Sequence, residues 1–294
     1  MERETIRKQL LEMRKWMFQM DAEQKKGYKN AGEVMEVPVD GEPHKIRYYS
    51  AGDGIRPVYI DIHGGGMVWG SMENGDLLAR MFNSELGIHV ISLDYPLVPD
   101  TEYPQTMEYL YGTVRELVRH AKQYRLDKDK MVIGGRSAGG NLSAVMCVLA
   151  AQRGEFRFRG QILDHPWLDL CGLISWEGRP KDETMTQEVM RALAFGYADE
   201  AQQKEVTCTP LLASEELLTQ LPPAIIQTCE LDPLRVEGER YGQMLQSAGV
   251  QVRAFCFPNV PHGFSENNTE IGEAGRKALI DAVKEEWTWF ADCE

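Results

Sequence analysis

Short apolar runs alternate with amphipathic stretches along most of the chain. The runs rich in β-branched and aromatic residues are typical of strands and lie at 58–62, 89–93, 131–134, 160–163, 224–228 and 251–257. Helical periodicity occupies the intervals between them, near 74–86, 104–124, 138–152, 234–248 and 271–291. This alternation predicts an α/β fold with a mostly parallel central sheet and helices on both faces.

The N-terminal part of the chain follows another pattern. Within residues 4–20 the apolar side chains recur every three or four positions, which predicts an amphipathic helix carrying Ile6, Leu10, Met13, Met17 and Met20. Two alternating segments, 33–39 and 44–49, flank an Asp-Gly turn and predict an antiparallel hairpin at a sheet edge. Because the helix precedes the sheet pattern, it either belongs to the core or covers a site.

The alternation stops between residues 165 and 221, where the chain is mixed in character and rich in Trp, Met and charged residues. A segment this long between two strands is more typical of a lid or cap than of a plain loop. The length of 294 residues allows one large α/β domain. We therefore expect a single domain over 1–294 with cap elements at about 1–30 and 165–221.

Composition and charge exclude several classes of protein. A hydrophobic fraction of 43% and a charged fraction of 26% are typical of globular proteins. A net charge of −13 disfavours nucleic acid as a partner. The longest apolar run, 144–151, is too short to span a bilayer, and charges of both signs interrupt the N-terminus, which is unlike a secretory signal. We expect a cytoplasmic protein, unless a leader has been removed.

Cysteine and histidine spacing argues against metal and redox sites. The sequence has no Cys-x-x-Cys pair, and its six histidines are scattered without the His-Glu-x-x-His pattern. Free buried thiols are therefore expected rather than disulfides, at Cys147, Cys171, Cys208, Cys229, Cys256 and Cys293. No metal and no cofactor is expected.

The strongest chemical signal is the Gly-Arg-Ser-Ala-Gly sequence at 135–139. It follows an apolar strand and precedes a helix, which is the context that a nucleophile elbow requires. Small neighbours allow the tight turn, so the hydroxyl of Ser137 would be exposed there. Gly-x-Ser-x-Gly alone is a weak pattern, and an ordinary Gly/Ser turn is the alternative.

Three glycines follow His63 directly after the strand at 58–62. The N–H groups of Gly64 and Gly65, together with that of Ala138, could bind the negative oxygen of a tetrahedral intermediate. A flexible glycine turn is the alternative. His63 itself is interpreted as structural, because an elbow hydrolase takes its base from near the C-terminus.

Two further residues complete the pattern. Asp232 follows the strand at 224–228, at the sheet edge where sites form, although Pro233 makes a helix N-cap equally plausible. His262 follows the strand at 251–257. The order Ser137, Asp232, His262 is the Ser…Asp…His order of α/β-hydrolases, and each residue comes after a predicted strand of one sheet.

The sequence resembles the hormone-sensitive-lipase-like (HGGG-type) esterases of the α/β-hydrolase superfamily from about residue 58 to residue 264. The motifs are His-Gly-Gly-Gly at 63–66, Asp-Tyr-Pro-Leu-Val-Pro at 94–99, Gly-Arg-Ser-Ala-Gly-Gly at 135–140, Asp-Pro-Leu-Arg at 232–235 and His-Gly-Phe at 262–264.

The resemblance implies an α/β-hydrolase fold with a cap built partly from the N-terminal segment. It also implies a Ser137–His262–Asp232 triad and an oxyanion hole from the N–H groups of Gly64, Gly65 and Ala138. The family usually hydrolyses esters of short or medium acyl chains without a cofactor. Related esterases often dimerise through an edge strand, so a homodimer is expected by resemblance.

Two positions depart from the family's pattern. Arg136 stands where the family commonly has Asp or Glu, and Pro96 stands where it commonly has Arg. The charge of Arg136 then needs another partner, for which Glu102, Asp100 and Asp94 are candidates.

Arg136 has two interpretations. It could shift the preference toward acidic substrates or tune the pKa of His262. Alternatively it forms a surface-side ion pair with no catalytic role, and this interpretation is slightly favoured.

The sequence gives weaker indications of the residues that line the pocket and of the bond that is cleaved. Candidate wall residues are apolar, although such side chains more often belong to the core: Met67, Val68 and Trp69 after the glycine loop, and Trp167, Phe195 and Tyr197 in the cap. A small-molecule ester is the expected substrate. Amides, formamides or acetylated sugars are the enzymatic alternative, and a non-catalytic binding protein on the same scaffold is a further one.

Overall fold

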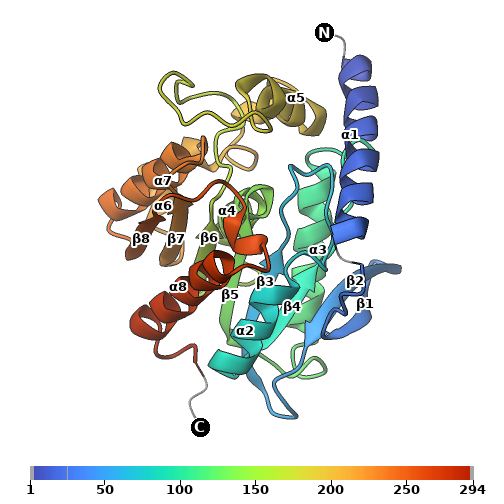
Figure 1. Ribbon diagram of the computed structural model, residues 1–294. Coiled ribbons are helices and arrows are strands. Elements are labelled where there is room, and N and C mark those ends of the chain that lie inside the picture. Colours follow the sequence, from blue (N-terminus) through green and yellow to red (C-terminus); the bar gives the residue numbers. More distant parts are fainter. Residues whose placement is uncertain (1–2, 25, 292–294) are drawn as a thin grey trace.

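The computed structural model describes residues 3–24 and 26–291 (Figure 1). Within them the strands form one eight-stranded sheet in the order β1-β2-β4-β3-β5-β6-β7-β8. Strand β2 runs antiparallel to both of its neighbours, and all pairs from β4 to β8 are parallel. The strands are β1 (Glu33–Val39), β2 (Glu42–Tyr49), β3 (Arg56–Ile62), β4 (His89–Leu93), β5 (Leu126–Arg136), β6 (Gly160–Asp164), β7 (Ala224–Cys229) and β8 (Val252–Phe257).

Helices connect the strands and cover both faces of the sheet (Figure 1). The α-helices are α1 (Arg3–Gln24), α2 (Asp76–Leu86), α3 (Gln105–Arg119), α4 (Ala138–Arg153), α5 (Gln187–Tyr197), α6 (Glu215–Leu218), α7 (Arg235–Ser247) and α8 (Glu270–Glu286). Short 3₁₀ turns lie at η1 (Gln202–Lys204), η2 (Pro210–Leu212) and η3 (Phe264–Glu266). The predicted α/β fold with a mostly parallel sheet is confirmed.

The two faces of the sheet separate the hydrophobic core into two layers. Strand side chains alternate between faces, so Val58, Ile60 and Ile62 of β3 pack in the layer of α3 and α4. Tyr59, from the same strand, packs with α2 and α8 in the other layer. Because helices cover both faces, most parallel strands are continuously buried, which explains their short, mostly apolar runs in the sequence.

The N-terminal helix and the segment between β6 and β7 lie at the same end of the sheet (Figure 1). Leu10 of α1 packs so closely on Gly196 of α5 that a side chain at that glycine would overlap it. Ile6 and Leu10 are buried, whereas Met20 is 44% exposed. The predicted apolar stripe therefore contacts the protein along its N-terminal part only.

Most predicted element bounds agree with the structure within a few residues, and those of β1 and β4 are identical. The largest differences are of five residues: α8 ends at Glu286 where 291 is expected, and α3 ends at Arg119 where 124 is expected. A turn follows it, in which Arg125 adopts a positive φ of 58°, and β5 then begins earlier than expected, at Leu126. Helical periodicity alone does not locate such a turn.

The remaining sequence expectations concern thiols, membrane spans and metals. Cys147, Cys208 and Cys229 are free and buried, Cys171 is partly buried, and Cys256 is exposed, so the expectation of burial is wrong for Cys256. Cys293 lies outside the described residues. Among the helices of the described chain, none is long and apolar enough to cross a membrane. The same part of the chain contains no cluster of three or more His, Cys, Asp or Glu that could hold a metal ion.

Candidate active site

Ser137 occupies a sharp turn between the end of β5 and the start of α4. Its φ of 53° and ψ of −118° are strained for a residue with a side chain. Gly139 permits this turn, because a Cβ at that position would collide with the carbonyl of Ile62 at the end of β3. The local geometry is that of the nucleophile elbow expected from the sequence.

The structure brings Ser137, His262 and Asp232 together in one hydrogen-bonded chain. Nε2 of His262 lies 2.9 Å from Oγ of Ser137, and Nδ1 of His262 lies 2.7 Å from Oδ2 of Asp232. The other carboxylate oxygen, Oδ1, accepts a hydrogen bond of 2.7 Å from the N–H of Leu234. The three side chains follow β5, β8 and β7, so the carboxyl ends of parallel strands hold them in register.

Asp232 is not the N-cap of the following helix. Helix α7 begins at Arg235 with Leu234 in the cap position, and Pro233 precedes the helix. The carboxylate of Asp232 instead caps a local turn and faces His262. The structural alternative offered by the sequence for Asp232 is therefore wrong.

The electrostatic environment favours the charged form of His262. Burial by itself lowers the pKa of His262, but the charge and the hydrogen bond of Asp232 outweigh burial, and the pKa is raised. An imidazole of this kind gains a proton readily when the nucleophile releases one. The arrangement can therefore perform general-base catalysis on the Ser137 hydroxyl.

The glycine loop after β3 lies directly against the nucleophile. A Cβ on Gly64 would stand 2.9 Å from the carbonyl oxygen of Arg136 and 3.4 Å from Cβ of Ser137. Gly65 has a φ of 103°, and its carbonyl accepts hydrogen bonds from Val68 and Trp69. These contacts require residues without side chains at both positions.

Ala138 adds an N–H group directly after the nucleophile. It is the first residue of α4. The first N–H groups of a helix have no partner within the helix and carry its partial positive charge. The loop of Gly64 and Gly65 and the first turn of α4 thus converge on Ser137, as an oxyanion hole requires.

Tyr95 supports the glycine loop from behind. Its ring stacks on that of His63 at a centroid distance of 4.1 Å, and its hydroxyl donates a 3.1 Å hydrogen bond to the His63 carbonyl. His63 is buried at this point. The sequence motif at 94–99 contained Tyr95, but only the structure shows how this tyrosine holds the loop.

The candidate pocket residues divide into two groups. Met67, Val68 and Trp167 are fully or almost fully buried within the main hydrophobic cluster, and the N–H of Trp167 donates to the carbonyl of Ser137. Trp69 is only partly buried. Sequence reasoning missed Leu193 of α5, whose Cδ1 would stand 3.0 Å from a Cβ on Gly66. The segment between β6 and β7 thereby reaches the glycine loop.

Arg136 forms a buried ion pair, which corrects the expectation of a surface-side pair. Its Nη1 lies 2.7 Å from Oδ1 of Asp61, and its Nη2 lies 3.2 Å from Oδ2, so the pair is bidentate. Both side chains are at most 3% exposed. Because both terminal nitrogens of Arg136 bind Asp61 away from solvent, this guanidinium is not placed to bind an acidic substrate.

The proposed partners of Arg136 make other contacts. Glu102 pairs with Arg3 and Arg7 of α1, and Asp100 pairs with Arg14 of the same helix. Asp94 lies 3.9 Å from His63. The actual partner, Asp61, could have been suspected because it is an acid inside a buried apolar strand, two residues before the glycine motif.

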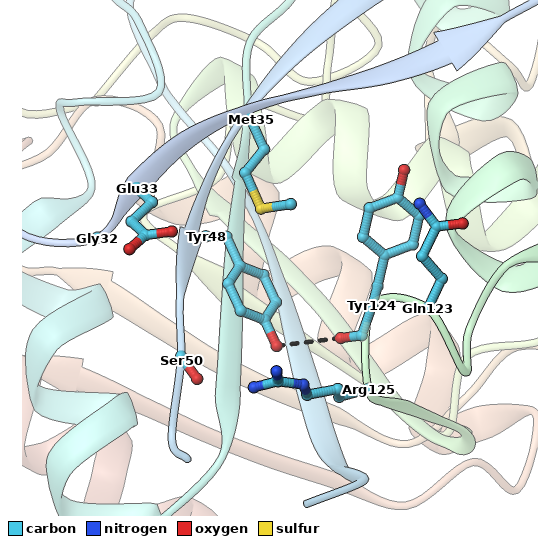
Figure 2. Close-up of a pocket in the computed structure, with 8 residues that line it drawn as sticks. All are labelled: Gly32, Glu33, Met35, Tyr48, Ser50, Gln123, Tyr124 and Arg125. Carbon is cyan, nitrogen blue, oxygen red and sulfur yellow. Dashed lines mark hydrogen bonds between the residues drawn. The ribbon is translucent and has the colours of Figure 1, made fainter. Parts of the chain in front are cut away.

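Two cavities lie elsewhere in the protein. One of about 590 Å³ lies between the β1–β2 hairpin and the turn before β5, where the hydroxyl of Tyr48 donates to the carbonyl of Tyr124 (Figure 2). The other, of about 500 Å³, lies in the cap, and Phe195 is among its lining residues. Neither lining includes a triad residue. Tyr197, which lies in α5 with Phe195, is buried.

Comparisons with known proteins agree with this geometry. Residues 59–266 match the family described as having the alpha/beta hydrolase fold. A carboxylic ester hydrolase of Mycobacterium tuberculosis, LipN, is 31% identical over 86% of this chain and 70% of its own length. An ethyl acetate hydrolase of Pseudomonas putida is 29% identical over 76% of this chain and 71% of its own length.

The similarity extends to solved structures. The carboxylesterase EstE1, cloned from a metagenomic library, superposes with a TM-score of 0.85 at 26% identity and covers 94% of this chain and 97% of its own. The match of the family model spans most of the chain, and it includes the nucleophile elbow, the glycine loop and the positions of Asp232 and His262. The chain therefore belongs to the α/β-hydrolase family, among its hormone-sensitive-lipase-like carboxylesterases.

Proposed function

We propose that the protein is a serine esterase that hydrolyses carboxylic esters through an acyl-enzyme. The observation that carries this proposal is the unbroken hydrogen-bond chain from Ser137 through His262 to Asp232. It starts at a strained elbow and lies against a loop of glycine N–H groups. The esterase names of the relatives support the same activity.

In the first step, His262 takes the proton of Ser137 at Nε2 while Oγ attacks the ester carbonyl carbon. Asp232 holds the imidazole by its Nδ1–H and stabilises the imidazolium. The carbonyl oxygen becomes negative and accepts hydrogen bonds from the N–H groups of Gly64, Gly65 and Ala138. His262 then gives its proton to the leaving alcohol, and the acyl group remains on Ser137.

In the second step, water takes the place of the alcohol. His262 removes a proton from the water, the resulting hydroxide attacks the acyl-enzyme, and the same N–H groups stabilise the new oxyanion. Collapse of this intermediate releases the carboxylic acid, and the proton held by His262 returns to Ser137. These residues carry the reaction with no metal or cofactor.

We expect esters of short and medium acyl chains to be the substrates. Leu193 packs so closely on Gly66 that a Cβ there would stand 3.0 Å from its Cδ1, and in this proposal its side chain limits the acyl pocket. We place Trp69, which is partly exposed, in the pocket wall. Helix α1 and residues 165–221 act in this proposal as the cap that closes the site.

The test is the hydrolysis of p-nitrophenyl esters from acetate to decanoate by the wild type, by Ser137→Ala and by Ser84→Ala. Ser84 is an exposed serine on α2 and serves as the control. We expect turnover of short and medium esters by the wild type and Ser84→Ala, and a loss of turnover of at least about 10⁴-fold in Ser137→Ala. A folded wild type that cleaves none of these esters would contradict the proposal and favour an amide, a formamide or an acetylated sugar.

The proposal extends to location and assembly. The free thiols at Cys147, Cys208 and Cys229 suit a reducing compartment, which supports a cytoplasmic location. The edge strand β8 alternates exposed and partly buried residues, and its outer backbone groups could pair with a second copy. A homodimer through this edge is testable by sedimentation, since Pro substitution at exposed Ala254 would then yield monomers.

A further inference from the structure

The loop that carries His262 is fastened immediately after the histidine, at turn η3. The hydroxyl of Ser265 donates a 2.5 Å hydrogen bond to Oδ2 of Asp164, at the end of β6. Nη1 of Arg276 in α8 donates to the carbonyls of Ser265 and Asn267. Strand β6 and helix α8 therefore hold two sides of this turn.

A third attachment joins the turn to the nucleophile strand. Nε of Arg136 lies 3.6 Å from Oε2 of Glu266, while its two other nitrogens bind Asp61. The guanidinium that directly precedes Ser137 is thus shared by two carboxylates. One positive charge faces two negative ones, so Arg136 does not cancel the negative charge of Glu266.

The neutral ring of His165 completes the surroundings of Glu266. Its Nε2 lies 4.0 Å from Oε1 of Glu266, and its ring meets that of His262 edge to face at a centroid distance of 4.5 Å. Burial and the neighbouring charge of His262 lower the pKa of His165 well below its usual value. His262 is therefore the ring of this pair that becomes positively charged.

We propose that Glu266 is a positioning residue for the esterase reaction: tied to Arg136, it fixes the loop of His262 relative to Ser137 and places a negative charge beside the imidazolium that forms during acyl transfer. This inference rests on the proposed function. The side chain of Glu266 is 26% exposed, so solvent screens its charge only in part. Arg136 thereby acts in catalysis through Glu266, and it does not itself contact a substrate.

Charged and titratable groups face Glu266 and His262 from every element packed against them. Strand β3 contributes Asp61, the end of β5 contributes Arg136, and the end of β6 contributes Asp164 and His165. The remaining groups are Asp232 after β7, Arg276 of α8, and Tyr95 after β4. Glu266 is an acidic group whose charge raises the pKa of His262 and which also forms an ion pair with Arg136 of the elbow strand.

The test uses the intact enzyme and three variants. Glu266→Gln removes the charge and keeps the shape, Glu266→Asp keeps the charge, and Glu270→Gln makes the same amide change at an exposed position four residues later. Steady-state rates with p-nitrophenyl acetate are measured from pH 5 to pH 9, and unfolding temperatures are measured in parallel.

We expect Glu266→Gln to lower kcat about tenfold with KM nearly unchanged, because a charge beside the imidazolium acts in the transition state. The acidic limb of the kcat/KM profile should move to lower pH by about half a unit, since losing a nearby negative charge disfavours the protonated imidazole. Glu266→Asp should restore the pH profile, and Glu270→Gln should match the wild type in rate and profile.

An unchanged acidic limb in Glu266→Gln would overturn the proposal, whether the rate is retained or falls together with the unfolding temperature. If the wild type cleaves no ester, the same shift is measured on the His262 ring by NMR titration of labelled histidine. A wild type without turnover contradicts the proposed function, whereas an unshifted His262 resonance contradicts the role of Glu266. The two failures are therefore distinguishable.

Discussion

Different interactions hold the residues at the carboxyl ends of the parallel strands and the residues of the proposed cap in place. Ser137 and Asp232 follow buried parallel strands, His262 follows the edge strand β8, and the charged pair of Arg136 and Asp61 is almost fully withdrawn from solvent. In the cap, helix α1 is attached through partly exposed pairs such as that of Arg7 and Glu102. Exposed pairs contribute at most about 1 kcal/mol each, so these ion pairs hold α1 only weakly.

One ion pair of the cap segment is buried and therefore differs from the exposed pairs of α1. Arg179, within the cap segment, binds Glu237 of α7 at 2.7 Å, and Glu237 accepts the N–H groups of Leu168 and Asp169. This pair ties the beginning of the cap to the helix that follows Asp232. The cap segment therefore has a buried ion pair beside the site, whereas the ion pairs of α1 are partly exposed.

The largest expected effect comes from a change in the triad at the carboxyl ends of the strands. Asp232→Asn should lower kcat by about 10⁴-fold, because the amide holds the imidazole of His262 in the wrong tautomer. Ester turnover and the unfolding temperature are measured together. Asp281→Asn, at an exposed position of α8, is the control and should retain full rate. An Asp232→Asn enzyme within tenfold of the wild type would contradict the triad.

The next effect concerns the buried ion pair of Arg179 and Glu237 in the cap segment. Arg179→Met leaves the carboxylate of Glu237 buried without its partner, so the free energy of unfolding should fall by about 3–5 kcal/mol. Arg7→Met, in the exposed pair of α1, should cost less than about 1 kcal/mol. Urea unfolding followed by fluorescence measures both. Equal losses in the two variants would remove the distinction between the attachments.

A smaller effect sharpens the role of the cap in selectivity. Leu193→Ala removes the side chain that lies over Gly66 and should raise the rate ratio of longer to shorter acyl esters about tenfold. The kcat/KM values for p-nitrophenyl acetate and octanoate give this ratio. Leu212→Ala, at an exposed leucine of the cap, should leave the ratio unchanged. An unchanged ratio in Leu193→Ala would place the acyl pocket elsewhere.

The smallest effect concerns pH in the wild type. Since the pKa of His262 is raised, kcat/KM should fall with decreasing pH through an apparent pKa above 6.5. Protonated His262 cannot accept the proton of Ser137, which gives the direction. The measurement is a buffer series at constant ionic strength. A midpoint below 6.5 would show that burial outweighs the charge of Asp232.

The parallel strands and the triad residues that follow them could be predicted from the sequence because their signals are local. The parallel strands have short, mostly apolar runs, and three of these runs are followed within five residues by Ser137, Asp232 or His262, in the chain order of a hydrolase. Ser137, Asp232 and His262 were identified in this way, and the structure places them within hydrogen-bond distance of one another. Gly64 lies beside the nucleophile for the same reason.

The partners of Arg136 and the inner face of the cap could not be predicted, because they depend on contacts between distant segments. Asp61 and Glu266 are brought to Arg136 by a neighbouring strand and by a loop far along the chain. The cap segment lacks a regular period, so nothing in its pattern indicated that Leu193 would reach Gly66. Charge compensation in a core is a tertiary property.

The pair of Asp61 and Arg136 also restricts how the central strands can assemble. Strands β3 and β5 are parallel, their buried central residues are otherwise mostly apolar, and Asp61 lies opposite Gly134 in their pairing. A shift of one residue would turn a charged side chain to the other face and bury it without a partner. Such a mispaired sheet would be disfavoured by several kcal/mol. The ion pair therefore acts as a register lock that selects one alignment of the two strands during folding.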